Sequence, residues 1–265
     1  MNETPDGVNS QVPNVARIYD YLLGGKDNYA TDREAAERLL SAAPETVGTV
    51  RTNRAFLRRV VRRLAAEGFR QFVDIGAGLP TQANVHEVAR EVASDSRVVY
   101  IDNDPVVVAH GRALLADSAQ VTVLQGDLRE PAKIFEEPRL RSMIDPGEPV
   151  AVLLLAVLHF VTDDQDPAGI VRQIREWMPP GSALVLSHVT SEANRAEAAS
   201  TAKTIYDQST ASIALRTRQE ILTFFDGFEL DEPGLVYAPE WHPDETVPPG
   251  PPEASFLFTG VGRRR

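Results

Sequence analysis

The residues best suited to bind a nucleotide lie in the run Phe72-Val73-Asp74-Ile75-Gly76-Ala77-Gly78. An apolar, β-favouring stretch that ends in closely spaced glycines is typical of a strand leading through a tight turn into a helix. Such strand–Gly-x-Gly–helix units let a ligand approach the backbone and hold nucleotides in many doubly wound α/β proteins. Thr81 stands where a dinucleotide fingerprint has its third glycine. The turn therefore indicates a nucleotide site without saying which nucleotide.

Asp102 and Asp127 stand where two further strands would end, after 97–102 and 121–125. Ligands of open parallel sheets bind beyond the carboxyl ends of the strands. Asp102, followed by Asn103, can accept hydrogen bonds from both hydroxyls of a ribose, each worth roughly 1.5–3 kcal/mol. Asp127 suits the exocyclic amine of adenine, with Leu128 against the ring. The alternative for both aspartates is a turn residue.

Asp74 lies inside the first strand, where an aspartate is unfavourable unless it has a partner. That partner is either the backbone amides of the turn or the ammonium group of a ligand. Two histidines follow the next strands, His159 after 149–156 and His188 after 183–187. Either histidine is a candidate general base for an oxygen or nitrogen nucleophile, or else a structural residue.

Strands and helices alternate through most of the chain and must position these side chains. Expected strands cover 71–75, 97–102, 121–125, 149–156, 183–187, 228–237 and 255–261, with helices over 83–93, 105–116, 167–178, 192–208 and 217–227. The last two strands have no helix between them, which permits an antiparallel pair. The pattern predicts a Rossmann-like α/β fold: a seven-stranded, mostly parallel sheet with one antiparallel edge strand and helices on both faces.

The first 68 residues precede this core and are mainly helical. Residues 1–12 are expected to be a disordered tail, 13–68 a helical lid or substrate segment with helices over 14–22, 31–41 and 52–67, and 69–265 the α/β core. The polar, tyrosine-rich stretch 14–29 fits a lid in which Tyr19 and Asn28 touch a ligand, or simple packing. The arginines between 51 and 70 are expected to form a solvated helix face.

The composition limits the partners of the protein. A formal charge of −11 opposes affinity for nucleic acid or anionic membranes. There is no cysteine, no apolar run near 20 residues and no signal peptide, which agrees with a cytoplasmic protein. The sequence contains no recognisable metal-ligand cluster.

The glycine turn, Asp102 and Gly126-Asp127-Leu128, in this order, resemble the class I S-adenosylmethionine-dependent methyltransferases. The run from Ala16 to Tyr29 is more particular and resembles a bacterial S-adenosyl methyltransferase family formerly filed as a domain of unknown function. The resemblance implies that S-adenosylmethionine is the cofactor and S-adenosylhomocysteine the product. Its implied contacts are Asp74 and Gly76, Ala77 and Gly78 with the methionine part, Asp102 with the ribose, Asp127 with adenine, and Ala156 to His159 with the sulfur side.

Three hypotheses follow. The first is in-line methyl transfer to O, N or C of an unidentified small molecule, by a monomer or homodimer. The second is a non-catalytic S-adenosylmethionine-binding protein. The third, an NAD(P)-dependent oxidoreductase, is disfavoured by Thr81 and Asp127.

Overall fold

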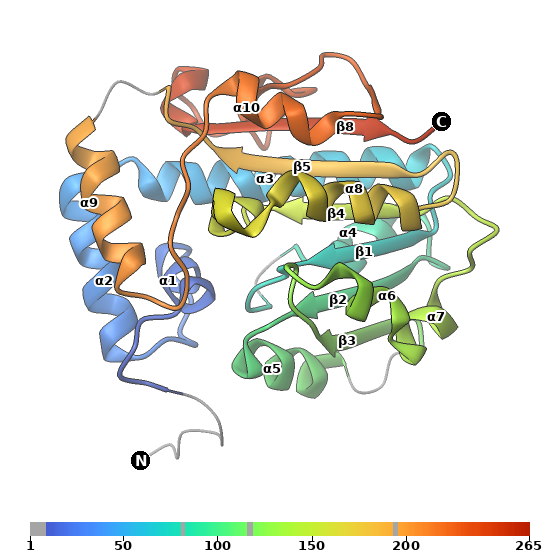
Figure 1. The fold of residues 1–265 in the computed structure, drawn as a ribbon, viewed down its shortest axis with the longest axis horizontal. Coiled ribbons are helices and arrows are strands. Elements are labelled where there is room, and N and C mark those ends of the chain that lie inside the picture. The colour runs from blue at the N-terminus through green and yellow to red at the C-terminus, as the bar shows by residue number, and fades with distance from the viewer. Residues whose placement is uncertain (1–8, 81–82, 116–118, 193–195) are drawn as a thin grey trace.

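The computed structural model describes residues 9–80, 83–115, 119–192 and 196–265. Eight strands form one sheet in the order β3-β2-β1-β4-β5-β8-β6, with β7 also paired to β8. The parallel strands are β1 (Gln71–Ile75), β2 (Arg97–Asp102), β3 (Val121–Gln125), β4 (Ala151–Leu155) and β5 (Ala183–Val189). Figure 1 shows β1, β2 and β3 ending on the side where α1 lies.

The expected α/β fold class is confirmed, with two differences at one side of the sheet. The expected strand 228–237 is divided into β6 (Glu229–Leu230) and β7 (Val236–Tyr237), because Pro233 and Gly234, with a φ of +86°, interrupt it. The reversed strand β8 (Leu257–Arg263) runs antiparallel to β5 and lies between β5 and β6, so it is not the outermost strand.

Helices cover both faces of the sheet, and alternate strand residues point to each face. One face, with Val73, Val99 and Val152, packs against α6 (Pro131–Glu136), α7 (Pro138–Met143), α8 (Pro167–Trp177) and α10 (Arg218–Leu222). The other, with Phe72 and Val98, packs against α3 (Thr46–Ala66), α4 (Val85–Val92) and α5 (Pro105–Leu115). This alternation fixes the register and therefore the side chains at the strand ends.

The N-terminal helices pack beside the sheet (Figure 1). Helices α1 (Val15–Leu22) and α2 (Ala30–Ala42) share an apolar cluster with Ile205 of α9 (Ala196–Asp207). Residues 9–12 contact this unit, since Arg17 donates hydrogen bonds to the carbonyls of Asn9 and Val12. The rest of the expected tail, 1–8, lies outside the described residues.

The expectation of a solvated arginine face on α3 is wrong for Arg59 and holds for Arg51 and Arg63. Arg59 is 5% exposed and donates to the carbonyls of Trp241 and Ala238 at 3.0 and 2.6 Å. Arg54 and Arg58 are partly buried, and on this helix Arg51 and Arg63 are exposed. Arg59 therefore attaches the C-terminal loop to α3, and Arg54 contributes to the site below. Among the described residues, no helix is long and apolar enough to cross a membrane.

Candidate functional site

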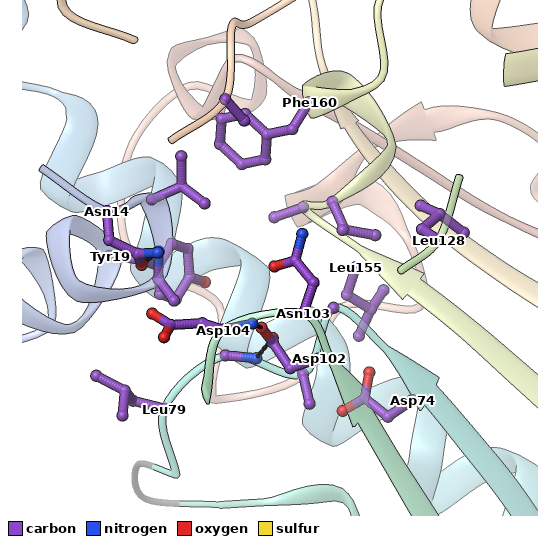
Figure 2. Close-up of a pocket in the computed structure, with 18 of the residues that line it drawn as sticks. Asn14, Tyr19, Asp74, Leu79, Asp102, Asn103, Asp104, Leu128, Leu155 and Phe160 are labelled. Atoms are coloured by element: carbon purple, nitrogen blue, oxygen red, sulfur yellow. Dashed lines mark hydrogen bonds between the residues drawn. The ribbon is translucent and has the colours of Figure 1, made fainter. Parts of the chain in front are cut away.

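A cleft opens at the carboxyl ends of β1 to β4, where the predicted site residues converge (Figure 2). Asn14 and Tyr19 lie on one side of it and Leu128 on the other. The structure brings together ten of the residues singled out from the sequence, namely Tyr19, Asp74, Gly76, Ala77, Gly78, Asp102, Asn103, Asp127, Leu128 and Ala156. Thr81 lies outside the described residues.

The glycine turn after β1 is held open by its own backbone conformation. Gly76 and Gly78 have φ values of +76° and +68°, which other residues rarely adopt. A Cβ at Gly76 would lie 2.3 Å from Cγ2 of Val157, so no side chain fits there. A Cβ at Gly78 would meet nothing within 4 Å, which leaves open space beside this backbone. The turn therefore offers bare backbone to a ligand.

Asp102 holds this turn in place. Its Oδ2 accepts a hydrogen bond from Gly78 N at 2.8 Å, and its Oδ1 accepts from Asp104 N at 2.9 Å. Burial raises the pKa of Asp102 to about 6, against the lowering effect of these two bonds. A carboxylate oxygen accepts more than one hydrogen bond, so Asp102 can hold the turn and still contact a ligand.

Asp104 caps helix α5, because its Oδ1 accepts a hydrogen bond from Val106 N at 2.8 Å. Its other oxygen, Oδ2, is buried in the cleft wall and has no hydrogen-bond partner within the described residues. Arg17 Nη1 lies 3.7 Å from this oxygen. Asp104 is therefore both a cap and an acceptor that faces the cleft.

Asp74 is 5% exposed, and burial raises the pKa of its carboxyl to about 7. Arg54 lowers this pKa and Asp102 raises it further, both by smaller amounts. Asp74 and Arg54 line the cleft and also a hollow of about 310 Å³ beneath the glycine turn, which we call the loop hollow. A buried carboxylate beside a guanidinium suits a ligand group that carries both charges.

Asp127 lies at the far end of the cleft and is paired with Arg129. Its Oδ1 accepts from N and Nε of Arg129 at 2.9 and 2.8 Å, and this pairing lowers the pKa of Asp127. Leu128 beside it is 6% exposed and provides an apolar surface. Asp127 thus stays ionised and keeps lone pairs that can accept from an amine.

The segment before α2 forms one wall of the cleft through Asn14, Val15, Ala16, Tyr19 and Asp20. A buried ion cluster fixes it, because Arg17 Nε lies 2.8 Å from Asp32 Oδ2 and Arg17 Nη1 also faces Asp104. The predicted Asn28 does not line the cleft: its Nδ2 donates to Asp20 Oδ2 at 2.8 Å. Asn28 therefore supports Asp20 rather than forming the wall itself.

A second cavity of about 160 Å³, which we call the side cavity, adjoins the cleft. The two share a set of lining residues, Val15, Tyr19, Asn53, Ala156 and Phe160. His159 lines the side cavity and is absent from the cleft wall. It is 4% exposed, its Nδ1 has no hydrogen-bond partner among the described residues, and burial lowers its pKa well below the usual value.

A chain of hydrogen bonds crosses the junction between the cleft and the side cavity. Ala156 N donates to Ser187 Oγ at 2.8 Å, and Ser187 Oγ donates to Asn53 Oδ1 at 2.7 Å. Asn53 Nδ2 then donates to Tyr19 OH at 3.0 Å, which donates to Val50 O at 3.2 Å. Ala156 has a φ of +53°, a conformation unusual for alanine that is held by this chain at the junction.

His188 lies outside all three described cavities. It is fully buried, and its Nε2 accepts from Arg216 Nη1 at 2.9 Å while its Nδ1 lies 2.6 Å from Val189 O. Both ring nitrogens are thus occupied, and burial lowers the pKa of His188 to about 3. The geometry gives His188 a supporting place behind His159, whose ring centroid is 5.5 Å away.

Several cleft residues could not be recognised in the sequence. Asn53 and Arg54 belong to a helix with an ordinary amphipathic pattern, and Asn14 reads as a plain helix cap, which it also is. Phe160 looked like part of an apolar run. The signal that could have found Asn53 is that an amide is unfavourable on the apolar face of a helix.

Comparison with known proteins agrees with this geometry. A family model described as S-adenosyl methyltransferase matches residues 1–265. The chain is 38% identical to a Thermobifida fusca protein assigned as a methyltransferase, with a TM-score of 0.92 and 100% of both chains covered. It is 40% identical to a DUF574 family protein from Streptomyces avermitilis, with a TM-score of 0.92 over 97% of this chain and 99% of that one.

A more distant structure, PigF with SAH, is 18% identical with a TM-score of 0.53, covering 88% of this chain and 69% of that one. This likeness shows a shared fold. A search among curated proteins returned no match.

Proposed function

Because the chain belongs to the S-adenosyl methyltransferase family, we propose that the cleft at the ends of β1 to β4 is where it holds S-adenosylmethionine. The chain is a methyltransferase that uses this cofactor, which supplies a methyl group from its sulfonium. The residues present fit it. Asp104 Oδ2 is a buried acceptor without a hydrogen-bond partner among the described residues, Gly78 borders open space, and Asp74 is a carboxyl whose pKa burial raises to about 7.

Asp74 and Arg54 would hold the amino-acid end of the cofactor. This end is a zwitterion, and the described cleft wall contains two cationic side chains, Arg54 and Arg129. Arg54 lines the cleft and its charge acts on Asp74, so we assign the carboxylate to Arg54 and the ammonium to Asp74. An ammonium beside Asp74 compensates the buried charge, which otherwise costs free energy.

Asp102, Asp104 and Asp127 would hold the nucleoside. Asp102 and Asp104 lie two residues apart and both face the cleft, so they can accept from the two ribose hydroxyls. Asp127 would accept from the adenine amine and Leu128 would cover the ring. Asn103 lines the cleft between these groups.

The junction of the two cavities would be where the methyl group is transferred. Tyr19 and Phe160 present aromatic rings there, which attract a cation by about 0.5–2 kcal/mol. Side chains of α1 and α3 exclude water, and the chain from Ala156 to Tyr19 fixes the wall so that donor and acceptor can be aligned. His159, kept neutral by burial, would accept a hydrogen bond at Nδ1 and orient the acceptor.

Other features of the proposal concern partners and place. We propose a small-molecule acceptor, since the side cavity has room for about one six-membered ring and the formal charge of −11 opposes nucleic acid. The chain would act in the cytoplasm as a monomer or homodimer.

The convergence of Asp74, Asp102 and Asp127 on one cleft carries the proposal. Asp102→Ala should weaken S-adenosylmethionine binding ten- to a hundredfold in calorimetry, because hydrogen bonds to a charged acceptor are worth about 1.5–3 kcal/mol. Asp164→Ala, which removes an exposed aspartate, is the control. Unchanged affinity in Asp102→Ala would remove Asp102 from the site. Binding without methyl transfer to any component of a metabolite extract would instead support the non-catalytic alternative.

A further inference from the structure

The side cavity has the composition of a site for a small apolar molecule. Its walls come from α1, α2, α3, β5, α9 and the segments after β4 and before β8. Most lining residues are aliphatic or aromatic, and Phe160 and Tyr206 lie with ring centroids 5.3 Å apart. Pockets of this kind take their affinity from apolar contact and their orientation from a few polar groups.

The volume limits the size of the occupant. The side cavity measures about 160 Å³. An engineered apolar cavity of about 150 Å³ in another protein binds benzene. A molecule with one six-membered ring therefore fits, whereas a second fused ring would have to extend into the cleft or into solvent.

The charges limit its chemistry. Among the described residues that line the side cavity, Glu45 is acidic and none is a lysine or arginine. A carboxylate or phosphate ester would have to leave water without a cationic partner, which is strongly unfavourable. The occupant should therefore carry no negative charge.

His159 indicates which polar group the occupant carries. Its Nδ1 is buried and has no hydrogen-bond partner within the described residues. A buried polar atom without a partner destabilises a protein, so this nitrogen is expected to bind a ligand or a water molecule. Nδ1 is a donor in one tautomer and an acceptor in the other. A hydroxyl group can serve either tautomer because it both donates and accepts.

We propose that the side cavity binds the methyl acceptor and that this acceptor is a single-ring aromatic alcohol without a negative charge, whose hydroxyl contacts Nδ1 of His159. The inference rests on the proposed function, because the side cavity matters for methyl transfer only if the cleft holds the cofactor. Methylation of this hydroxyl forms an O–CH₃ bond with an oxygen lone pair and breaks the S–CH₃ bond, whose electron pair stays on sulfur. The hydroxyl donates a hydrogen bond to Nδ1 of His159, in the tautomer that leaves this nitrogen unprotonated, and its proton is released to water as the methyl group is transferred.

The test uses the whole protein saturated with S-adenosylhomocysteine and three matched probes, phenol, toluene and benzoate, followed by ligand-observed NMR. Phenol should bind, toluene should bind about three- to tenfold more weakly because it lacks the hydrogen bond, and benzoate should not bind. With labelled S-adenosylmethionine, phenol should yield labelled anisole. Benzoate binding as tight as phenol, or no phenol binding while S-adenosylhomocysteine binds, would overturn the inference and leave the proposed function intact. Failure of S-adenosylhomocysteine to bind would overturn the proposed function.

Two variants locate the binding. Ala202→Phe on α9 fills the side cavity away from the cleft and should weaken phenol binding at least tenfold without changing S-adenosylhomocysteine binding. Thr204→Phe, at an exposed position of the same helix, should change neither. His159→Phe should abolish the preference for phenol over toluene, and this comparison holds even if Ala202→Phe does not fold. Retained preference in His159→Phe would refute the contact.

Discussion

Asp74→Asn should stabilise the ligand-free protein against unfolding and lower its affinity for S-adenosylmethionine. The Asp74 carboxyl is buried, and its pKa rises from 3.8 to about 7. Because one pKa unit corresponds to about 1.36 kcal/mol, this rise makes the ionised carboxylate about 4 kcal/mol less stable in the folded chain than in the unfolded chain. Asparagine has a similar shape and no charge to bury.

The sign of the pH dependence follows from proton uptake. Between pH 4 and 7 the folded chain keeps the Asp74 proton more than the unfolded chain does, so the free energy of unfolding of the wild type falls as pH rises. Asp74→Asn has no carboxyl at this position, so its free energy of unfolding should not fall with pH for this reason. Its advantage should be about 4 kcal/mol at pH 8, about 2 kcal/mol at pH 5 and close to zero below pH 4.

Urea unfolding of both proteins at pH 5 and pH 8 measures this difference. At pH 8 the advantage corresponds to a rise in Tm of about 8 to 16 °C for a chain of this size. Asp164→Asn, at an exposed position, should stay within about 0.5 kcal/mol of the wild type at both pH values. A variant less stable than the wild type at pH 8 would refute the reasoning, since it would mean that the folded protein itself stabilises the charge.

S-Adenosylmethionine should reduce the difference in stability between Asp74→Asn and the wild type at pH 8. At a concentration 100 times its Kd it stabilises a folded protein by about 2.7 kcal/mol. The variant should bind it more weakly, because a charge-assisted hydrogen bond of about 1.5–3 kcal/mol to the ammonium is lost. In the wild type, affinity should fall about tenfold per pH unit well below pH 7 as Asp74 is protonated, and calorimetry should show no such fall due to this group in Asp74→Asn.

Two further variants test how the cleft is built. Arg17→Met leaves two buried carboxylates without their cation, so the free energy of unfolding should fall by about 3–5 kcal/mol, whereas Lys203→Met at an exposed pair should cost at most about 1 kcal/mol; equal losses in urea unfolding would contradict the burial argument. Ser187→Ala should lower the free energy of unfolding by about 1–3 kcal/mol and also the kcat of methyl transfer, since Ala156 N loses its side-chain partner at the junction. A loss of stability with unchanged kcat would show that the hydrogen-bond chain has no part in catalysis.

The sequence predicts those parts of the candidate site where a residue type departs from the pattern of the surrounding strand. Gly76, Gly78 and Asp102 stand at strand ends, where strand periodicity stops and glycine or aspartate would otherwise be unfavourable. Their positions follow once the sheet is parallel, because all such ends lie at one edge. The sheet itself was predictable from its apolar runs.

The remaining features depend on tertiary contacts. Helices α6 and α7 have six residues each, too few for a helical period to be recognised. Arg54 and Asn53 read as ordinary residues of an amphipathic helix, and nothing local shows that α3 passes the ends of β4 and β5. His159 and His188 look equivalent in the sequence. Arg216, which lies 28 residues from His188 in the chain, hydrogen-bonds to the ring of His188 and not to that of His159.

The N-terminal helices and the sheet pack together and share hydrogen bonds, despite the division at residue 68 that the sequence suggests. Helix α3 packs Phe56, Val60 and Leu64 into the core on one face of the sheet, so removing it would expose that face. The hydrogen-bond chain runs from Ala156 after β4, through Ser187 of β5 and Asn53 of α3, to Tyr19 of α1. Since the same residues line both the cleft and the side cavity, α1 cannot move far without changing the place where donor and acceptor meet. The segment is therefore a wall of the cleft to which Tyr19 contributes, whereas Tyr21 hydrogen-bonds to Glu37 and Tyr29 lies against Arg17.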